Sequence, residues 1–123
     1  MEQHKFSLFK RLKSFSYAFN GLKILFSEEH NSRIHFAATI AVITLGIIFD
    51  LDKYEWTAII FSVGLVITSE IINTSIENIA DFISPDKNEK IKRIKDLSAA
   101  AVLISAVTAL SIGLIVFIPK INF

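Results

Sequence analysis

Cysteine is absent from the 123-residue chain, which excludes disulfides, thiol nucleophiles and thiolate metal sites. The GxxxxGKS/T and GxGxxG loops that hold nucleotide phosphates in many proteins are absent as well. The four glycines, at positions 21, 46, 64 and 113, are scattered along the chain. Any phosphate-binding site in this protein must therefore be built from other residues.

Apolar residues are abundant and lie in long runs. They make up 52% of the chain, and the mean hydropathy is +0.51, which is high for a soluble domain of this length. We therefore expect an all-α integral membrane protein with one domain, residues 1–123. The basic N-terminal region is not followed by a short apolar core with a small-residue cleavage site, so we interpret it as mature sequence.

Residues 5–27 are predicted to form an amphipathic helix that lies in the membrane interface. Lys10 and Lys13 fall on the face opposite the apolar side chains, and phenylalanines are frequent on the apolar face. The apolar stripe repeats at steps of four and three residues and consists of Leu8, Leu12, Phe15, Phe19, Leu22 and Phe26.

Three transmembrane helices are predicted, at residues 34–51, 55–83 and 97–118. Tyr54 and Trp56 fit an aromatic belt at the start of the second helix. Pro85 ends the second helix, because proline disfavours a helical residue before it, and Pro119 ends the third. The sequence between the second and third helices, DKNEKIKRIKD, is expected to be a loop that carries charges of both signs.

Basic residues are distributed unevenly between the predicted loops. Residues 1–33 hold six and residues 86–96 hold five, whereas the first loop and the C-terminal tail hold one each, Lys53 and Lys120. The positive-inside rule then places the N-terminus and the second loop in the cytoplasm and the C-terminus outside. The net charge of +1 says nothing about partners.

Four polar residues form one stripe on the second predicted transmembrane helix. Glu70, Asn73, Glu77 and Asp81 are separated by three, four and four residues, which places them on one helical face. Carboxylates at membrane depth indicate a functional site, although a polar seam between packed helices is the alternative. Glu70 and Glu77 lie roughly 10 Å apart along the axis, which suits a base at one level and a metal ligand at another. Three spans cannot easily enclose this stripe, so we expect a homo-oligomer.

The segment around residue 28 allows a purely structural interpretation. Ser27 with Glu28 and Glu29 is suited to cap the next helix, whose first turn favours negative charge. His30 and His35 lack a third nitrogen ligand nearby, so we interpret them as interfacial polar residues rather than as a zinc site.

Carboxylates and lysines on a cytoplasmic membrane face suit phosphoryl transfer to an anionic or lipid substrate. Carboxylates hold Mg²⁺, lysines neutralise phosphate charge, and a carboxylate can take the proton from an attacking hydroxyl. A small transporter or proton-conducting protein that uses the Glu70 and Glu77 stripe is the alternative that these residues leave open.

The segment SEIINTSIENIAD resembles the ExxNTxIExxxD signature of the bacterial integral-membrane diacylglycerol kinase and undecaprenol kinase family. FNGLK ahead of EEHN, and KDLSAAAV at the start of the last helix, extend the likeness over nearly the whole chain. The resemblance implies a homotrimer in the bacterial cytoplasmic membrane, with three spans and a surface helix per subunit and active sites shared between neighbours. It implies ATP and a membrane lipid alcohol as substrates, Mg²⁺ as cofactor and no nucleic-acid partner.

The same resemblance implies roles for individual residues. Glu70 would accept the proton of the lipid hydroxyl, with Asn73 positioning the reacting groups near it. Glu29 and Glu77 would hold the divalent ion bound to ATP, which replaces the cap interpretation of Glu29. Trp56 and Ala99 would line the lipid route. The nucleotide-binding residues that it implies are Lys10, Tyr17, Glu29, Glu77, Asp81, Asp86, Lys87, Asn88, Lys95 and Asp96.

Three segments are more similar to the undecaprenol kinase branch than to the diacylglycerol branch: EHNSRIHFAA, YEW and GLIVFIPKI. Both lipids are primary alcohols, so one site chemistry serves either. The likeness favours undecaprenol as the acceptor.

Overall fold

The computed structural model describes residues 7–121, and every regular element within that range is a helix. The α-helices are α1 (Leu8–Glu28), α2 (His30–Ile48), α3 (Lys53–Ile83) and α4 (Glu89–Phe117), followed by a short 3₁₀ helix, η1 (Ile118–Ile121). Three helical segments, His30–Ile48, Lys53–Ile83 and Glu89–Ile121, are long and apolar enough to cross a membrane. The predictions of an all-α fold and of three membrane spans are therefore confirmed.

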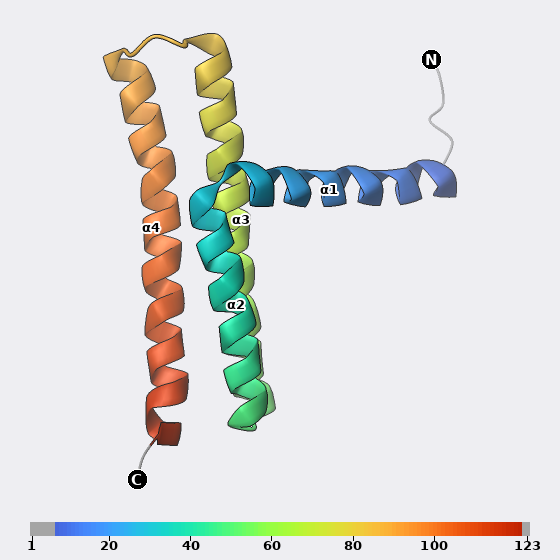
Figure 1. Cartoon of the computed structure of the whole chain (residues 1–123), viewed down its shortest axis with the longest axis vertical. Helices are drawn as coiled ribbons and strands as arrows, with labels where there is room; N and C mark the ends of the chain where they lie inside the picture. Colours follow the sequence, from blue (N-terminus) through green and yellow to red (C-terminus); the bar gives the residue numbers. More distant parts are fainter. Residues whose placement is uncertain (1–6, 122–123) are drawn as a thin grey trace.

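Helix α1 extends sideways from the bundle, nearly perpendicular to the three long helices (Figure 1). Most of its apolar side chains are exposed, among them Phe9, Phe15 and Phe19 at 74%, 63% and 68%, whereas Leu25 near its end is buried. Residues 5 and 6 of the predicted surface helix lie outside the described range. The location of α1 in a membrane interface stays a prediction.

A side-chain cap sets the start of α4 and corrects the predicted boundary. The Asn88 side chain accepts a hydrogen bond from the backbone N–H of Ile91 at 2.9 Å, so α4 begins at Glu89 rather than at residue 97. Lys92 and Asp96 pair at 2.8 Å one turn apart, which supports the first turns of this helix. Most of the predicted charged loop is therefore helical.

The helix predicted at residues 34–51 is displaced toward the N-terminus and spans His30–Ile48. It begins early because Glu29 is the single extended residue that separates α1 from α2. It ends early because Asp50 adopts a positive φ of 53°, a left-handed conformation that Asp tolerates better than most residues. The side chain of Asp52 then caps α3 by accepting from the N–H of Glu55 at 2.8 Å.

Helices α3 and α4 form a long antiparallel hairpin, and α2 packs beside α3 (Figure 1). Small buried serines allow the helices to approach closely, and Ser62, Ser69 and Ser105 are all less than one-tenth exposed. Their hydroxyls donate to carbonyls of their own helices at 2.8 Å, so the burial leaves these donors satisfied.

An apolar cluster closes the end of the bundle that lies away from the α3–α4 turn. Leu51, Ile59 and Val116 form its buried centre, and Trp56 and Phe117 pack against it. Beside it, Nζ of Lys120 lies 2.9 Å from Oε2 of Glu55, which ties η1 to the start of α3.

Replacing Gly46 with alanine is expected to destabilise this cluster. An added Cβ would lie 2.6 Å from Cη2 of Trp56 and 3.1 Å from Cδ1 of Leu51, and the indole ring is rigid. Overpacking of this kind costs about 1–3 kcal/mol, which thermal unfolding in detergent micelles would detect. Gly64→Ala is the matched control because nothing lies within 4 Å of its added Cβ. Equal melting temperatures for the two variants would contradict this prediction.

Helices α3 and α4 are long enough that the end of α3 and the start of α4 extend beyond the level of α1. The 31 residues of α3 span about 46 Å, against about 30 Å for the hydrocarbon core of a bilayer. Helix α1 meets α2 partway along α3, so the last turns of α3 and the first turns of α4 extend past it (Figure 1). The polar stripe begins with Glu70 at the level of the bend between α1 and α2, and it continues along α3 into this region.

Candidate functional site

Glu70 is the most deeply buried carboxylate of the described chain, at 2% exposure. The hydroxyl of Ser32, which is 1% exposed, donates to its Oε2 at 3.4 Å. Nε2 of His35 lies 3.1 Å from its Oε1, but Oε1 receives no hydrogen bond. Both neighbours come from α2 and neither was predicted as a site residue. The interpretation of His35 as an interfacial polar residue did not include this contact with Glu70.

Asn73 connects α3 to α4. Its Oδ1 accepts a hydrogen bond from the hydroxyl of Ser98 at 2.5 Å, and its Nδ2 donates to Oε1 of Glu77 at 3.4 Å. Asn73 is 8% exposed, whereas Glu77 is half-buried. The hydrogen bonds of Asn73 thus orient Glu77, and none of them reaches Glu70.

Glu29 lies at the bend between α1 and α2 and faces the other carboxylates. Burial raises its pKa above the usual value, and repulsion from Glu77, Glu70 and Glu28 raises the pKa further. The predicted cap at Ser27 is wrong, because α1 continues through this residue and its hydroxyl donates back to the carbonyl of Ile24 at 3.1 Å. Glu29 occupies the N-cap position of α2 without a capping hydrogen bond.

Arg33 fixes the bend that places Glu29. Its Nε donates to the carbonyl of Phe26 at 2.8 Å, and its second guanidinium nitrogen donates to the carbonyl of Ser27 at 2.6 Å. A cation at this position interacts favourably with the C-terminal carbonyls of α1. The reach of Arg33 back to the preceding helix depends on the bend, so spacing along the sequence did not predict it.

The carboxylates near the bend fit a divalent metal held jointly with a substrate. No group of three or more His, Asp or Glu side chains within residues 7–121 forms a complete metal cage. Mg²⁺ is commonly bound by one or two carboxylates plus substrate phosphates, so two carboxylates such as Glu29 and Glu77 would be enough protein ligands. The mutual repulsion that raises the pKa of Glu29 is what a bound cation would relieve.

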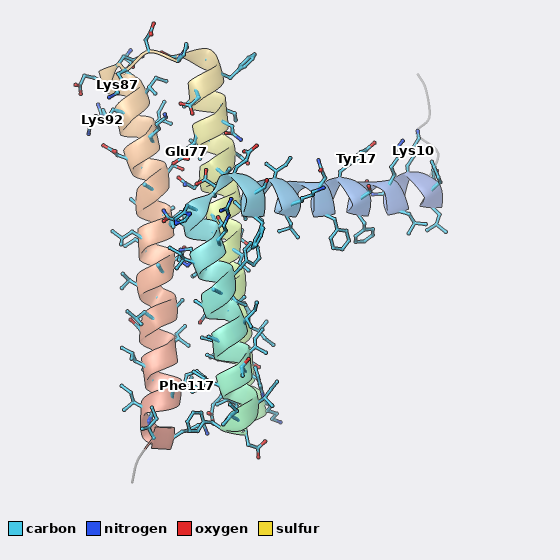
Figure 2. All side chains as sticks on the ribbon, in the orientation of Figure 1. Lys10, Tyr17, Glu77, Lys87, Lys92 and Phe117 are labelled. Carbon is cyan, nitrogen blue, oxygen red and sulfur yellow. The ribbon has the colours of Figure 1, made fainter. Side chains whose placement is uncertain are left out.

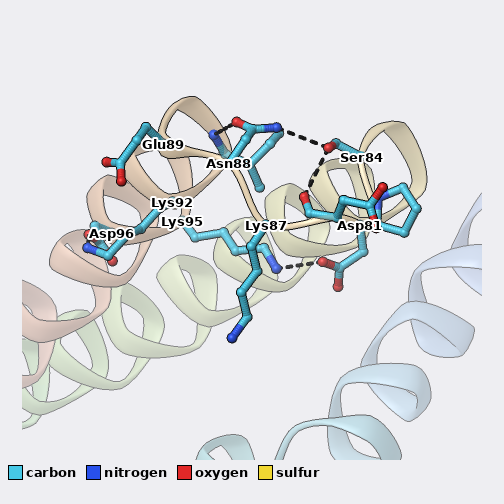
Figure 3. Close-up of a pocket in the computed structure, with 11 residues that line it drawn as sticks. Asp81, Ser84, Lys87, Asn88, Glu89, Lys92, Lys95 and Asp96 are labelled. Carbon is cyan, nitrogen blue, oxygen red and sulfur yellow. Dashed lines mark hydrogen bonds and ion pairs between the residues drawn. The ribbon is translucent and has the colours of Figure 1, made fainter.

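A cavity of about 620 Å³ lies at the α3–α4 turn (Figure 3). Its volume is within the range of small-molecule sites. Lys95 pairs with Asp81 at 2.5 Å and Lys92 pairs with Asp96 at 2.8 Å, so Lys95 and Asp96 each have a different partner. Six of the predicted nucleotide-binding residues line this cavity: Asp81, Asp86, Lys87, Asn88, Lys95 and Asp96.

The structure places the remaining predicted site residues away from this cavity. Lys10 and Tyr17 are exposed and lie far along α1 (Figure 2). Trp56 precedes Glu70 by fourteen residues on α3, roughly 21 Å along the axis, and packs against the apolar cluster. Ala99 is exposed on α4 beside Ser98. Contact of Trp56 or Ala99 with a lipid stays a prediction.

An apolar groove of about 380 Å³ runs between α2 and α4 over α3. It extends from His35, the residue next to Glu70, toward the cluster at the other end of the bundle. Residues that line it include His35, Val42, Ile59, Ala109, Leu114 and Phe117. The buried carboxylate therefore lies where an apolar surface meets the polar region of α3 and α4.

Comparisons with known proteins agree with these features. The model of the prokaryotic diacylglycerol kinase family matches residues 16–117. An undecaprenol kinase of Bacillus subtilis is 34% identical over 120 residues, which cover 98% of each chain. A diacylglycerol kinase of Synechocystis is 32% identical over 111 residues, 89% of this chain and 63% of that protein. A diacylglycerol kinase of Escherichia coli K12 is 32% identical over 98 residues, 80% of each chain.

Proposed function

The chain belongs to the prokaryotic diacylglycerol kinase family, and on this basis we propose that it transfers the γ-phosphate of ATP to the hydroxyl of a membrane lipid alcohol. Its relatives are undecaprenol and diacylglycerol kinases, so it is a lipid kinase. The observation that carries the proposed chemistry is the environment of Glu70: a buried carboxylate at the level of the α1–α2 bend, with one oxygen that receives no hydrogen bond.

Glu70 acts as the general base in the proposed reaction. It takes the proton of the lipid hydroxyl as the hydroxyl oxygen attacks the γ-phosphorus and ADP leaves. The hydrogen bond from Ser32 holds Oε2, and the oxygen without a hydrogen bond is the one suited to accept this proton. Burial excludes water, which would otherwise compete with the lipid as the acceptor of the phosphoryl group.

The nucleotide is proposed to bind in the cavity at the α3–α4 turn. Lys87, Lys92 and Lys95 line it and would neutralise phosphate charge. Along α3, Glu77 lies roughly 10 Å and Asp81 roughly 16 Å beyond Glu70. Along α3 the proposed base therefore comes first, followed by the proposed metal ligand and then by the nucleotide cavity. Glu29 and Glu77 would hold Mg²⁺, which when bound neutralises charge on the transferring phosphoryl group.

A homotrimer with shared sites is part of the proposal. Lys10 is nineteen residues from Glu29, roughly 28 Å along a helix that leads away from the bundle. Within one chain, Lys10 and Tyr17 therefore do not reach the cavity, whereas α1 of a neighbouring subunit would supply them. The proposed orientation places the cavity, with its three lysines, in the cytoplasm, consistent with the positive-inside rule.

Undecaprenol is the favoured acceptor. The undecaprenol kinase of Bacillus subtilis matches 98% of the chain, whereas the Escherichia coli diacylglycerol kinase matches 80%. The transporter alternative is not favoured, because no relative described above is a transporter and its conduction path would have to pass the closed apolar cluster around Leu51 and Ile59.

The test offers undecaprenol and diacylglycerol separately to the purified protein in micelles with Mg²⁺ and ATP labelled at the γ-phosphate. We expect label in both lipids and more in undecaprenol, since both are primary alcohols. A preference for diacylglycerol would reverse the assignment of the lipid. Label in neither lipid, from protein shown to be folded, would overturn the proposed function, and solute flux without ATP would support the transporter alternative.

A further inference from the structure

His35 is the nearest titratable neighbour of Glu70. Its Nε2 lies 3.1 Å from Oε1 of Glu70, across the contact between α2 and α3. The His35 side chain is 25% exposed and the Glu70 side chain is 3% exposed, so the pair connects a buried carboxylate to a more open region. The other oxygen of Glu70, Oε2, is already held by Ser32.

His35 differs in charge type from Glu29 and Glu77. Glu29, at the bend between α1 and α2, is close enough to Glu70 and Glu77 for their negative charges to repel one another. The lysines of the described ion pairs are engaged elsewhere, and the partners of Lys95, Lys92 and Lys120 are Asp81, Asp96 and Glu55. Within residues 7–121, His35 is thus the only basic side chain paired with Glu70.

We propose that His35 is a positioning residue that acts through Glu70, an inference that rests on the proposed phosphoryl transfer. A rotation of the ring that aligns Nε2–H with Oε1 would let Ser32 and His35 hold one oxygen each, and the second lone pair of Oε1 would stay open to the proton of the lipid hydroxyl. Hydrogen bonds to an ionised carboxylate are stronger than those to a neutral acceptor, so one to each oxygen would fix the plane of the base. A fixed base matters because a displacement of about 1 Å at a reacting group can cost 10²-fold in rate.

A packing role is the alternative, because His35 also lines the apolar groove. Three substitutions separate the two roles. His35→Leu keeps an apolar surface without a donor, His35→Gln keeps an N–H donor near the position of Nε2, and His35→Asn carries the same amide on a shorter side chain. A packing role predicts that leucine is tolerated best, whereas a positioning role predicts that glutamine is.

The expected result for His35→Leu is a fall in kcat of about 10- to 100-fold with the KM for Mg-ATP unchanged, since the interaction with Glu70 matters for the chemical step. His35→Gln is expected to recover kcat to within about fivefold of the wild type, and His35→Asn is not. His30→Leu is the matched control, because His30 is exposed on the same helix and precedes the contact with α3. Melting temperature and Mg-ATP affinity establish that each variant is folded.

A double-mutant cycle tests whether His35 acts through Glu70. In single-turnover phosphate transfer, adding His35→Leu to Glu70→Gln is expected to cause little further loss, because the base that His35 positions is already gone. Losses that add, or a His35→Leu variant as active as His30→Leu, would overturn the inference. The proposed function would survive either result, since it fails only if the wild type phosphorylates neither lipid.

Discussion

Glu70→Gln is expected to lower phosphate transfer to the lipid by about 10²- to 10⁴-fold, the range that a positioned general base contributes. Glutamine has nearly the same size as glutamate and its side-chain oxygen accepts hydrogen bonds. It can therefore replace the acceptor for Ser32, which donates at 3.4 Å, but it cannot take a proton. The fold and the affinity for Mg-ATP are expected to remain.

Three measurements on the same preparation check this expectation: single-turnover transfer of labelled phosphate, calorimetric titration with Mg-ATP, and size-exclusion chromatography for the oligomeric state. Glu55→Gln is the matched control. It makes the same change on the same helix, fifteen residues earlier and roughly 22 Å along the axis, where Glu55 pairs with Lys120. If Glu70→Gln instead dissociates the oligomer and Glu55→Gln does not, Glu70 belongs to a polar seam that holds helices together.

The number of spans was predictable because hydropathy over long runs reports membrane helices directly. The helix ends were less predictable, because single residues set them. Asn88 caps α4 through the N–H of Ile91, and the first turns of that helix are rich in charged residues, which hydropathy assigns to a loop. The bend at Glu29 depends on Arg33, which reaches back to carbonyls of the preceding helix.

Some residues of the candidate site could likewise be predicted from the sequence, and others could not. Residues on one helix, such as Glu70 and Glu77, follow from the helical period, because steps of three and four return to one face. The neighbours that define their environment lie on other helices. Ser32 and His35 on α2 contact Glu70, and Ser98 on α4 contacts Asn73. Spacing within a segment carries no information about these contacts, since they depend on how the helices pack.

The ion pairs of the cavity show a further limit of reasoning from position alone. Lys95 and Asp96 are adjacent in sequence, and the family resemblance treats them as a pair. In the structure they point to different partners, because neighbouring residues on a helix are directed about 100° apart. Lys95 bridges to Asp81 on α3 and thus connects the two helices at the cavity, whereas Asp96 pairs with Lys92 on its own helix.

Glu77→Gln is expected to weaken the binding of Mg-ATP at least roughly tenfold, because even the loss of a group that only supports a metal ligand typically costs 10- to 100-fold in affinity. Two observations support this assignment. Asn73 orients Glu77 by donating to its Oε1 at 3.4 Å, and Glu77 is the largest charge contribution to the raised pKa of Glu29. Removing the charge of Glu77 leaves Glu29 as the single carboxylate of the predicted metal pair.

Titration with ATP in the presence and absence of Mg²⁺ separates a metal ligand from a general electrostatic effect. A ligand role predicts that Glu77→Gln loses affinity only when the metal is present. If Glu77 only repels the phosphates, Glu77→Gln should bind metal-free ATP more tightly and should not lose affinity for Mg-ATP. Glu70→Gln is the comparison variant, because it removes one negative charge from the same helix two turns away and should leave Mg-ATP binding intact. Equal Mg-ATP affinities for Glu77→Gln and the wild type would rule out Glu77 as a metal ligand and would leave its hydrogen bond with Asn73 as its function.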